Sequence, residues 1–332
     1  NNNYVYLTAS DGLHIVDITN LAAPTEITRY LIPGGAHDIL IRSQYGYIAE
    51  ADGLGVFDVS DPLNIAVIGR YDSPGLVHGI ATASNYIYTA DGGGLRIIDV
   101  AIPQTPTLRG IQDMIGDAQQ VAIAGQYAYV IDRVGLRIVN IAAPSHPTDV
   151  AFYNTPGNAL GIVIVGNLAY IIGAPAWNGS QWIDTGLRII NISNPTNPRE
   201  VGSYDLPGEG RSLVVSGKYA YVAAGSAGLR IIDLSTPSTP KEVGFDDTPG
   251  DAQAVVLSAN NAYIADGDGL RIVDISDPTT PHEVGFYDTP DNARDIAVAN
   301  GHAYILDSDP LNGGGLYTLD VTTPSSPTKQ SF

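Results

Sequence analysis

The sequence predicts an all-β protein, an eight-bladed β-propeller built from four-stranded antiparallel blades. The first observation behind this prediction is a repeated segment, Gly-Leu-Arg-Ile-Ile-Asp, which occurs at 94–99 and again at 228–233. Variants bring the copies to eight, with successive glycines 41, 41, 41, 51, 42, 41 and 46 residues apart. A period of about 41 residues along a whole chain is typical of repeat architectures. The copies begin at Gly12, Gly53, Gly94, Gly135, Gly186, Gly228, Gly269 and Gly315.

The second observation is that each repeat contains four short strands, which we call A to D. In the third repeat these are 77–81, 86–89, 94–100 and 107–112. All four are rich in β-branched and aromatic residues and are separated by turn residues, and no segment keeps a helical period. Four strands in about 41 residues fit a propeller blade, whereas the coils of a β-solenoid are usually shorter, roughly 20 to 29 residues.

Strand A is found only seven times, so blade 1 is predicted to lack its inner strand. The chain enters at strand B of blade 1 (Tyr4–Leu7) and stops near strand D of blade 8 (328–332). The absent strand either lies outside the 332 residues or is truly missing from blade 1. Because the repeat runs from end to end, we expect residues 1–332 to form a single domain.

Composition narrows the function classes. The formal net charge of −19 disfavours binding to nucleic acids or adsorption to anionic membranes. No segment is apolar enough to span a bilayer, and 44% hydrophobic residues are ample for a core. The absence of cysteine excludes disulfides, thiolate nucleophiles and cysteine-ligated metals. The sequence opens on Asn1 rather than methionine, so either a leader such as a signal peptide has been removed or the sequence was chosen to start at this residue.

At 269–281, Gly-Leu-Arg-Ile-Val-Asp-Ile followed by a Pro-x-x-Pro turn resembles the LVIVD repeat of bacterial and archaeal propellers. The resemblance recurs in all eight copies, with degenerate versions at 53–58 and 315–320. It implies an extracellular or cell-surface protein with a binding or scaffolding role. It supplies no catalytic motif.

The charges that recur in every blade are predicted to be structural. We expect the strand C arginines to make ion pairs between blades or hydrogen bonds to turn carbonyls, rather than to form a ring of anion ligands. They are Arg96, Arg137, Arg188, Arg230 and Arg271. The aspartates that close strand C are expected to cap turns, as are those that follow strand D. The latter are Asp72, Asp113, Asp205, Asp247 and Asp288.

Function should lie where the copies diverge, because shared residues are explained by shared packing. We expect the D-to-A and B-to-C connections to emerge on one face, with the starts of strands A lining a central channel. The aligned residues there are His37, His78, Gln119, Leu160, Arg211, Gln253 and Arg294, below a partial set of carboxylates and amides that includes Asp117, Glu209 and Asp251. This mouth is predicted to bind a small polar ligand or an ion, or alternatively to be a solvated channel.

Two insertions lengthen B-to-C connections, at about 173–185 in blade 5 and at 307–314 in blade 8. The first carries Trp177 and Trp182, the only tryptophans in the chain. They suit stacking on a sugar or anchoring a protein partner, although they could equally pack on their own blade.

A metal site is a further possibility. Asp266 and Asp268 place two carboxylates in one turn, as calcium loops do, so calcium is possible and no other cofactor is expected. His37 and His78 lack a third ligand for zinc.

The sequence favours a non-catalytic propeller that binds a ligand, a protein or a glycan on the loop-rich face. The alternative is a glycan-active hydrolase or lyase at the channel mouth. The residues that favour this alternative are His37, His78, Arg211 and Arg294, together with the carboxylates Asp38 and Asp295. No nucleophile-elbow or zinc-protease motif is present.

Overall fold

The computed structural model describes residues 3–9, 11–20, 25–114, 116–177, 180, 182–183, 186–290, 292–308 and 315–330. These residues contain strands and no helix. By its internal contacts the chain divides into two compact units. One comprises Asn1–Thr19, Thr25–Thr155 and Ile192–Pro198, and the other comprises Asn20–Pro24, Pro156–Asn191 and Arg199–Phe332. The expectation of a single domain stays a prediction.

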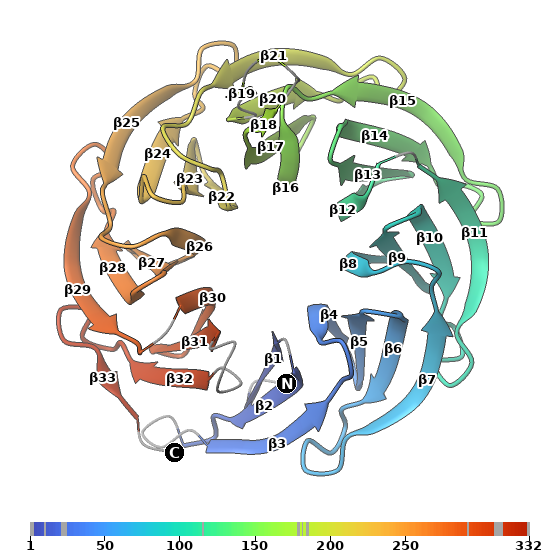
Figure 1. Cartoon of the computed structure of the whole chain (residues 1–332), viewed down its shortest axis with the longest axis horizontal. Coiled ribbons are helices and arrows are strands. Elements are labelled where there is room, and N and C mark those ends of the chain that lie inside the picture. Colours follow the sequence, from blue (N-terminus) through green and yellow to red (C-terminus); the bar gives the residue numbers. More distant parts are fainter. Residues whose placement is uncertain are drawn as a thin grey trace. The chain divides into compact units, whose positions relative to one another are not determined.

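The first unit contains blades 1 to 4, which follow one another along the chain (Figure 1). Blade 1 has three strands, β1 (Tyr4–Ala9), β2 (Gly12–Asp17) and β3 (Thr25–Leu31). Blade 2 has β4 (Ala36–Arg42), β5 (Tyr45–Glu50), β6 (Gly53–Asp58) and β7 (Ala66–Asp72). Blade 3 has β8 (Val77–Ala83), β9 (Tyr86–Asp91), β10 (Gly94–Asp99) and β11 (Thr107–Asp113). Blade 4 has β12 (Ala118–Ala124), β13 (Tyr127–Asp132), β14 (Gly135–Asn140) and β15 (Thr148–Asn154).

The second unit contains blades 5 to 8. Blade 5 has β16 (Asn158–Val165), β17 (Leu168–Ala174), β20 (Leu187–Asn191) and β21 (Arg199–Tyr204), with an extra hairpin of β18 (Ala176–Trp177) and β19 (Trp182–Ile183). Blade 6 has β22 (Ser212–Ser216), β23 (Tyr219–Ala223), β24 (Leu229–Asp233) and β25 (Lys241–Asp246). Blade 7 has β26 (Ala252–Ser258), β27 (Asn261–Asp266), β28 (Gly269–Asp274) and β29 (His282–Asp288). Blade 8 has β30 (Asn292–Ala299), β31 (His302–Ser308), β32 (Gly315–Asp320) and β33 (Thr328–Lys329).

Every blade is a simple antiparallel meander in chain order, from A to D in blades 2 to 8 and from B to D in blade 1. The predicted fold class is therefore confirmed: the chain is an all-β, eight-bladed propeller whose first blade has three strands among the described residues. The repeat period and the alternation of short apolar runs with turn residues were sufficient signals, because each blade has the same local design.

The hydrophobic core lies between successive blades. Leu95 and Ile97 of β10 pack with Val121 of β12 and Val130 of β13, for example, so the core joins blade 3 to blade 4. Strands B and C are buried on both faces. This explains why their sequences are nearly continuous apolar runs and do not alternate between apolar and polar residues. Each inter-blade layer thus depends on residues from two repeats.

The signature glycine at the start of strand C is required by the backbone. Gly94 has a φ of +132°, and a Cβ there would lie 2.8 Å from the backbone nitrogen of Met114 and still closer to the carbonyl oxygen of Gln112. Only glycine adopts this conformation and allows this approach of strand D without strain. The fixed hallmark of the repeat is therefore a packing constraint between strands C and D.

A second glycine explains the Pro-x-x-Pro turn. Gly110, in the middle of β11, lies against the C-to-D turn of the next blade, where a Cβ would be 2.8 Å from Pro147 Cδ and closer still to the carbonyl oxygen of Pro144. The same contact recurs at Gly69, Gly202, Gly244 and Gly285, each against the proline turn that follows. The C-to-D proline turn of one blade therefore packs closely against strand D of the preceding blade.

We expect Gly110→Ala to destabilise the fold by about 1 to 3 kcal/mol, because the added methyl group meets rigid backbone. Gly92→Ala is the matched control, since its Cβ would have only ordinary contacts, the nearest at 3.5 Å from Asp117 Oδ1. Urea unfolding followed by circular dichroism measures both. Equal midpoints for the two variants would show that the proline turn yields at no cost.

Candidate functional site

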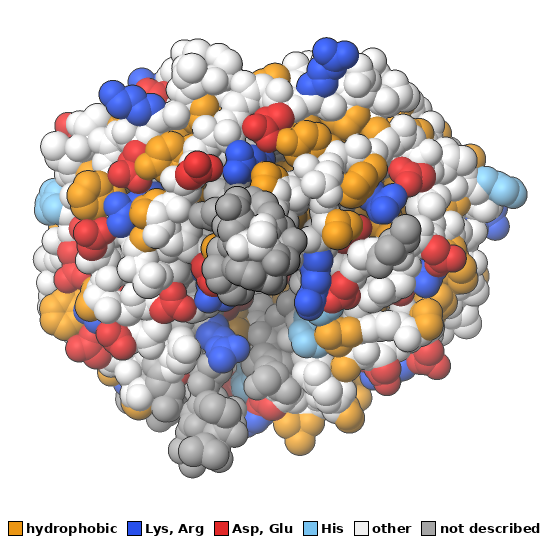
Figure 2. Space-filling model, turned by 45° about the horizontal axis from the view of Figure 1, so that its top comes forward, with side chains coloured by type: hydrophobic (Ala, Val, Ile, Leu, Met, Phe, Trp, Pro, Cys, Tyr) orange, Lys and Arg blue, Asp and Glu red, His pale blue; other side chains and the backbone are white. Residues whose placement is uncertain are grey.

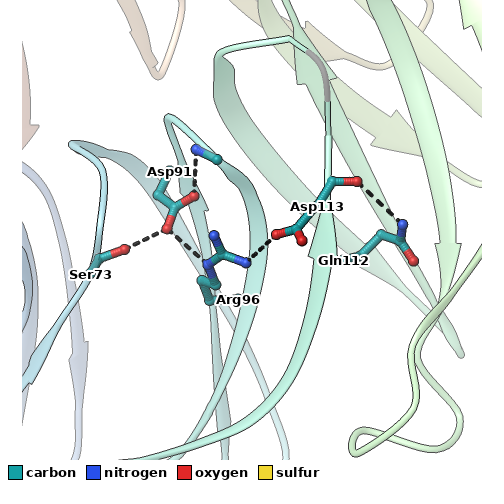
Figure 3. A network of polar contacts seen from close by, with 6 residues as sticks. Ser73, Asp91, Arg96, Gln112 and Asp113 are labelled. Carbon is teal, nitrogen blue, oxygen red and sulfur yellow. Dashed lines mark hydrogen bonds and ion pairs between the residues drawn. The ribbon is translucent and has the colours of Figure 1, made fainter.

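The repeat arginines are held by carboxylates of their own blade. In blade 3, Arg96 Nε donates to Asp91 Oδ2 at 3.2 Å and Arg96 Nη1 donates to Asp113 Oδ1 at 2.7 Å (Figure 3). Asp91 ends strand B and Asp113 ends strand D of the same sheet. The prediction that these arginines pair between blades is therefore wrong. The strands place both carboxylates beside the guanidinium, because β9 and β11 flank β10.

The aspartates after strand D have a role that the sequence did not reveal. Their expected function was to cap a turn, but they accept charged hydrogen bonds from the strand C arginine. The pairs are Arg96 with Asp113, Arg188 with Asp205, Arg230 with Asp247 and Arg271 with Asp288. By contrast, the aspartates that close strand C cap turns as predicted: Asp99 Oδ1, for example, accepts a hydrogen bond from the amide of Ala101 at 2.9 Å.

The buried aspartate at the end of strand B connects neighbouring blades. Asp91 is fully buried and also accepts a hydrogen bond from Ser73, which lies in the connection from blade 2 (Figure 3). Asp266 of blade 7 repeats this arrangement, since Thr248 Oγ1 and the amide of Gly250 each donate to it at 2.8 Å. These carboxylates stabilise the D-to-A connection on the neighbouring sheet.

This role bears on the calcium prediction for Asp266 and Asp268. The two oxygens of Asp266 already face Thr248, Gly250 and Arg271, whereas Asp268 is exposed. Among the described residues, no group of three His, Asp or Glu side chains is arranged to hold a metal ion. The residues present thus give Asp266 a structural function, and calcium binding stays a prediction.

In blade 2 a different ion pair takes the place of the pair between the strand C arginine and the buried aspartate. Gly55 stands where five other blades have arginine, and Glu50 replaces the buried aspartate of blades such as blade 3. Arg70, directly opposite Gly55 on β7, reaches Glu50 Oε2 at 2.5 Å. A Cβ at Gly55 would collide with the Glu50 carboxyl group, so the glycine makes room for the longer acid. Burial raises the pKa of Glu50 to about 7, against the opposing effect of Arg70.

The divergent residues at the starts of strands A form a polar cluster in the first unit. The rings of His37 and His78 have centroids 6.2 Å apart. His78 Nε2 lies 3.5 Å from Asp117 Oδ1, and Arg133 Nη2 lies 3.2 Å from Asp117 Oδ2. Gln119 donates to the carbonyl oxygen of Asp117 at 3.1 Å. We call these five residues the histidine cluster. Partial burial, and then the neighbouring His78, lowers the pKa of His37.

A second cluster lies at the equivalent positions of blades 6 and 7. Arg211 Nη2 is 2.8 Å from Glu209 Oε2 and 3.6 Å from Asp251 Oδ2. Gln253 Nε2 donates to Asp251 Oδ2 at 2.6 Å. We call these four residues the arginine cluster. In both clusters a cationic or imidazole side chain of one blade meets a carboxylate of the next.

The connections near these clusters meet as expected. The amide of Gly92, in the B-to-C turn of blade 3, donates to the carbonyl oxygen of Leu76, in the D-to-A connection, at 3.1 Å. Gly267 and Asp251 make the corresponding bond at 3.0 Å. The two kinds of connection therefore emerge side by side, and the clusters lie at their base.

The described contacts of these clusters include none of the remaining candidate residues. Arg294 is exposed and forms no ion pair with another described residue. The side chains of Trp177 and Trp182 lie outside the described part, although their backbones pair directly across the β18–β19 hairpin. Of the blade 8 insertion, residues 309–314 likewise lie outside the described residues.

Sequence reasoning missed Arg133. It stands in the B-to-C turn of blade 4, where blade 3 has Gly92, so the divergence between copies was visible in the sequence. Its contact with Asp117 was not, because the partner comes from the D-to-A connection, 16 residues earlier in the chain. The Glu50–Arg70 pair escaped notice for the same kind of reason: two departures from the repeat compensate each other in space.

We expect Asp91→Ala to destabilise the fold by about 3 kcal/mol or more, because it leaves the buried Arg96 guanidinium without its inner partner. Asp113→Ala removes the exposed partner of the same arginine and is expected to cost less than about 1 kcal/mol. Chemical unfolding of both variants measures the difference. A larger loss for Asp113→Ala would contradict the ranking.

We expect the stability of the chain to depend on pH through Glu50. The pKa of this acid is about 7 when folded and 4.5 as the unperturbed value, so the folded state binds the proton more tightly. The associated stability is fully present below the lower value and falls as the pH rises through the higher one. Glu50→Gln, which stays neutral, should therefore gain unfolding free energy relative to the natural chain between about pH 5 and about pH 8. A difference that is constant over this range in urea titrations would show that Glu50 titrates normally.

Comparison with known sequences and structures agrees with this organisation. The LVIVD repeat matches residues 1–32, 33–73, 74–113, 115–155, 156–206, 207–248, 249–289 and 290–331. A search of curated protein sequences gives no match.

Solved structures show the same fold at low sequence identity. A computationally designed protein, Ika8, is similar with a TM-score of 0.74 and 11% identity, covering 95% of this chain and 93% of that chain. AztD from Citrobacter koseri is similar with a TM-score of 0.65 and 15% identity, covering 98% and 94%. BamB from Moraxella catarrhalis is similar with a TM-score of 0.65 and 10% identity, covering 96% and 94%. With the repeat matched along its whole length, the chain belongs to the LVIVD repeat family.

Proposed function

We propose that this protein is a non-catalytic binding module, outside the cell or on its surface, that takes a polar ligand or a partner at the starts of its A strands. The observation that carries the proposal is the contrast between repeated and divergent charges. The repeated arginines and aspartates are engaged within the framework, whereas the divergent polar residues gather at the base of the connections.

The two clusters offer groups that a ligand can reach. The side chain of His78 is 25% exposed and that of Asp117 is 33% exposed. In the arginine cluster, Arg211 is 36% and Glu209 is 45% exposed. Imidazole, amide, guanidinium and carboxylate groups together supply both donors and acceptors, which suits a ligand rich in hydroxyl groups.

The charge distribution favours a glycan or a protein over nucleic acid. Acidic and basic side chains are interspersed on the face drawn in Figure 2, and the net charge of −19 opposes binding to phosphate backbones. Among the described residues, no helix has the length and apolar character to cross a membrane. The extracellular setting rests on the family resemblance, and propeller neighbours such as AztD and BamB support a binding or scaffolding role.

A printed array of neutral and acidic oligosaccharides tests the proposal. We expect at least one oligosaccharide to bind and its affinity to fall about tenfold or more in His78→Ala or Arg211→Ala, since tenfold corresponds to about 1.4 kcal/mol, the scale of a hydrogen bond to a charged or polar group. His146→Ala, at an exposed C-to-D turn, is the matched control and should bind like the natural chain. The only two tryptophans lie in the blade 5 hairpin, so a change in their fluorescence reports whether that insertion takes part. If no oligosaccharide binds, or if all three variants bind alike, the proposal fails.

A further inference from the structure

The histidine cluster contains more groups that can carry a positive charge than carboxylates. His37, His78 and Arg133 are the groups that can be cationic, and its one carboxylate is that of Asp117. This carboxylate is shared, because Oδ1 lies 3.5 Å from His78 Nε2 and Oδ2 lies 3.2 Å from Arg133 Nη2. Among the described residues, no carboxylate forms an ion pair with His37. Protonation of His37 therefore adds a positive charge that the cluster does not neutralise.

The two imidazole rings are close enough for each to influence the charge of the other. Their centroids lie 6.2 Å apart, with an angle of 52° between the ring planes. Partial burial, and then the neighbouring His78, lowers the pKa of His37. His37 is therefore mainly neutral near pH 7. An anion placed beside both rings would remove this electrostatic cost of protonating His37.

The acidic groups on the elements beside His37 are already engaged. Asp38, the next residue of β4, accepts hydrogen bonds from backbone amides of β4 and β8, at 2.8 and 2.9 Å. On β5 and in the turn that follows it, Glu50 and Asp52 both pair with Arg70. Strand β1, which also packs against β4, carries no charged residue. The counterion that a protonated His37 needs can therefore come from a ligand.

A ligand can reach the cationic side of the cluster. His37 is exposed, the side chain of His78 is 25% exposed and that of Arg133 is 63% exposed. Imidazolium and guanidinium groups have only donors, and their hydrogen bonds to anionic oxygens are stronger than those between neutral groups. The three side chains together thus suit a negatively charged oxygen group.

The arginine cluster has the opposite charge balance. Arg211 is its one cationic group and lies near two carboxylates, those of Glu209 and Asp251. Its fourth member, Gln253, is neutral. Because histidine is the side chain whose charge ordinarily changes between about pH 5 and about pH 8, only the histidine cluster gains positive charge as the solution becomes mildly acidic.

We propose that the histidine cluster binds the carboxylate of an acidic sugar, and that His37 takes up a proton from solvent when the sugar binds. This inference rests on the proposed function and names the ligand class of one of its two clusters. The carboxylate would lie against His37, His78 and Arg133. The net charge of −19 opposes a doubly charged phosphate more than a singly charged carboxylate, so a carboxylate is the better fit. Because coupling between two ligands is reciprocal, the affinity rises as the pH falls through the range in which His37 titrates.

The probe is D-glucuronate, added to the full chain at about pH 5 and about pH 7, with D-glucose as the uncharged counterpart. NMR signals of the imidazole C2–H groups report both the affinity and the protonation of each ring, and single His→Gln variants assign the six histidines. We expect glucuronate to bind about tenfold or more tightly at the lower pH and to shift the titration of His37 to higher pH. Glucose should show neither effect. His146, at an exposed turn, is the matched control and should not respond to glucuronate.

The variant His37→Gln keeps a polar side chain that cannot be protonated, so it should bind glucuronate with the same affinity at both pH values. A pH dependence that persists in this variant would overturn the proposal, as would equal affinities for glucuronate and glucose in the natural chain. Tighter binding of glucose 6-phosphate than of glucuronate would overturn the choice of a carboxylate.

These outcomes are distinguishable from failure of the proposed function. A neutral oligosaccharide that binds on the array and is weakened by His78→Ala would support ligand binding at the histidine cluster. If glucuronate did not bind in that case, only the assignment of an acidic sugar would be wrong. Because the NMR titration is made on the natural chain, it decides the question even if His37→Gln does not fold.

Discussion

Burial of strands B and C on both faces is the constraint on which the rest of this structure depends. A blade has apolar side chains on each side of its two central strands, and a single sheet cannot hide them. Packing against the neighbouring blades meets this need. The contact must be close, and this explains why glycine occurs where the proline turn of one blade lies on the outer strand of another.

The same burial decides what the repeated charges can do. A guanidinium inside a blade must be paired, because an isolated buried charge costs several kcal/mol. Each of the five strand C arginines therefore lies beside two carboxylates of its own blade, and the aromatic rings of Phe152, Phe245 and Phe286 cover three of them. Residues committed in this way are poor ligands, and for this reason we assign the proposed binding to the divergent side chains at the starts of the A strands. The separation of framework from site follows from electrostatics rather than from any motif.

Blade 2 shows that the constraint acts on the pair and not on particular residues. Glutamate replaces aspartate, glycine replaces arginine, and Arg70 supplies the positive charge from the neighbouring strand. Blade 1 reaches yet another arrangement, in which His14 lies between Asp11 and Glu26 at 2.9 and 2.8 Å. In blade 2 a buried acid meets a cationic group, and in blade 1 a buried imidazole meets two acids.

The sequence by itself determined the repeat, the strand order within each blade and the number of blades. These are local properties, carried by periodic glycines, apolar runs and turn residues, and local signals survive in a linear reading. It also indicated that His37 and His78 could reach each other across adjacent blades, and their ring centroids lie 6.2 Å apart. Only the tertiary structure decided that the arginines pair within blades, that Asp266 has a structural function, that Arg133 joins the histidine cluster and that Glu50 depends on Arg70. Those relations involve side chains from separate strands, whose reach and burial are set by packing and leave no trace in residue spacing.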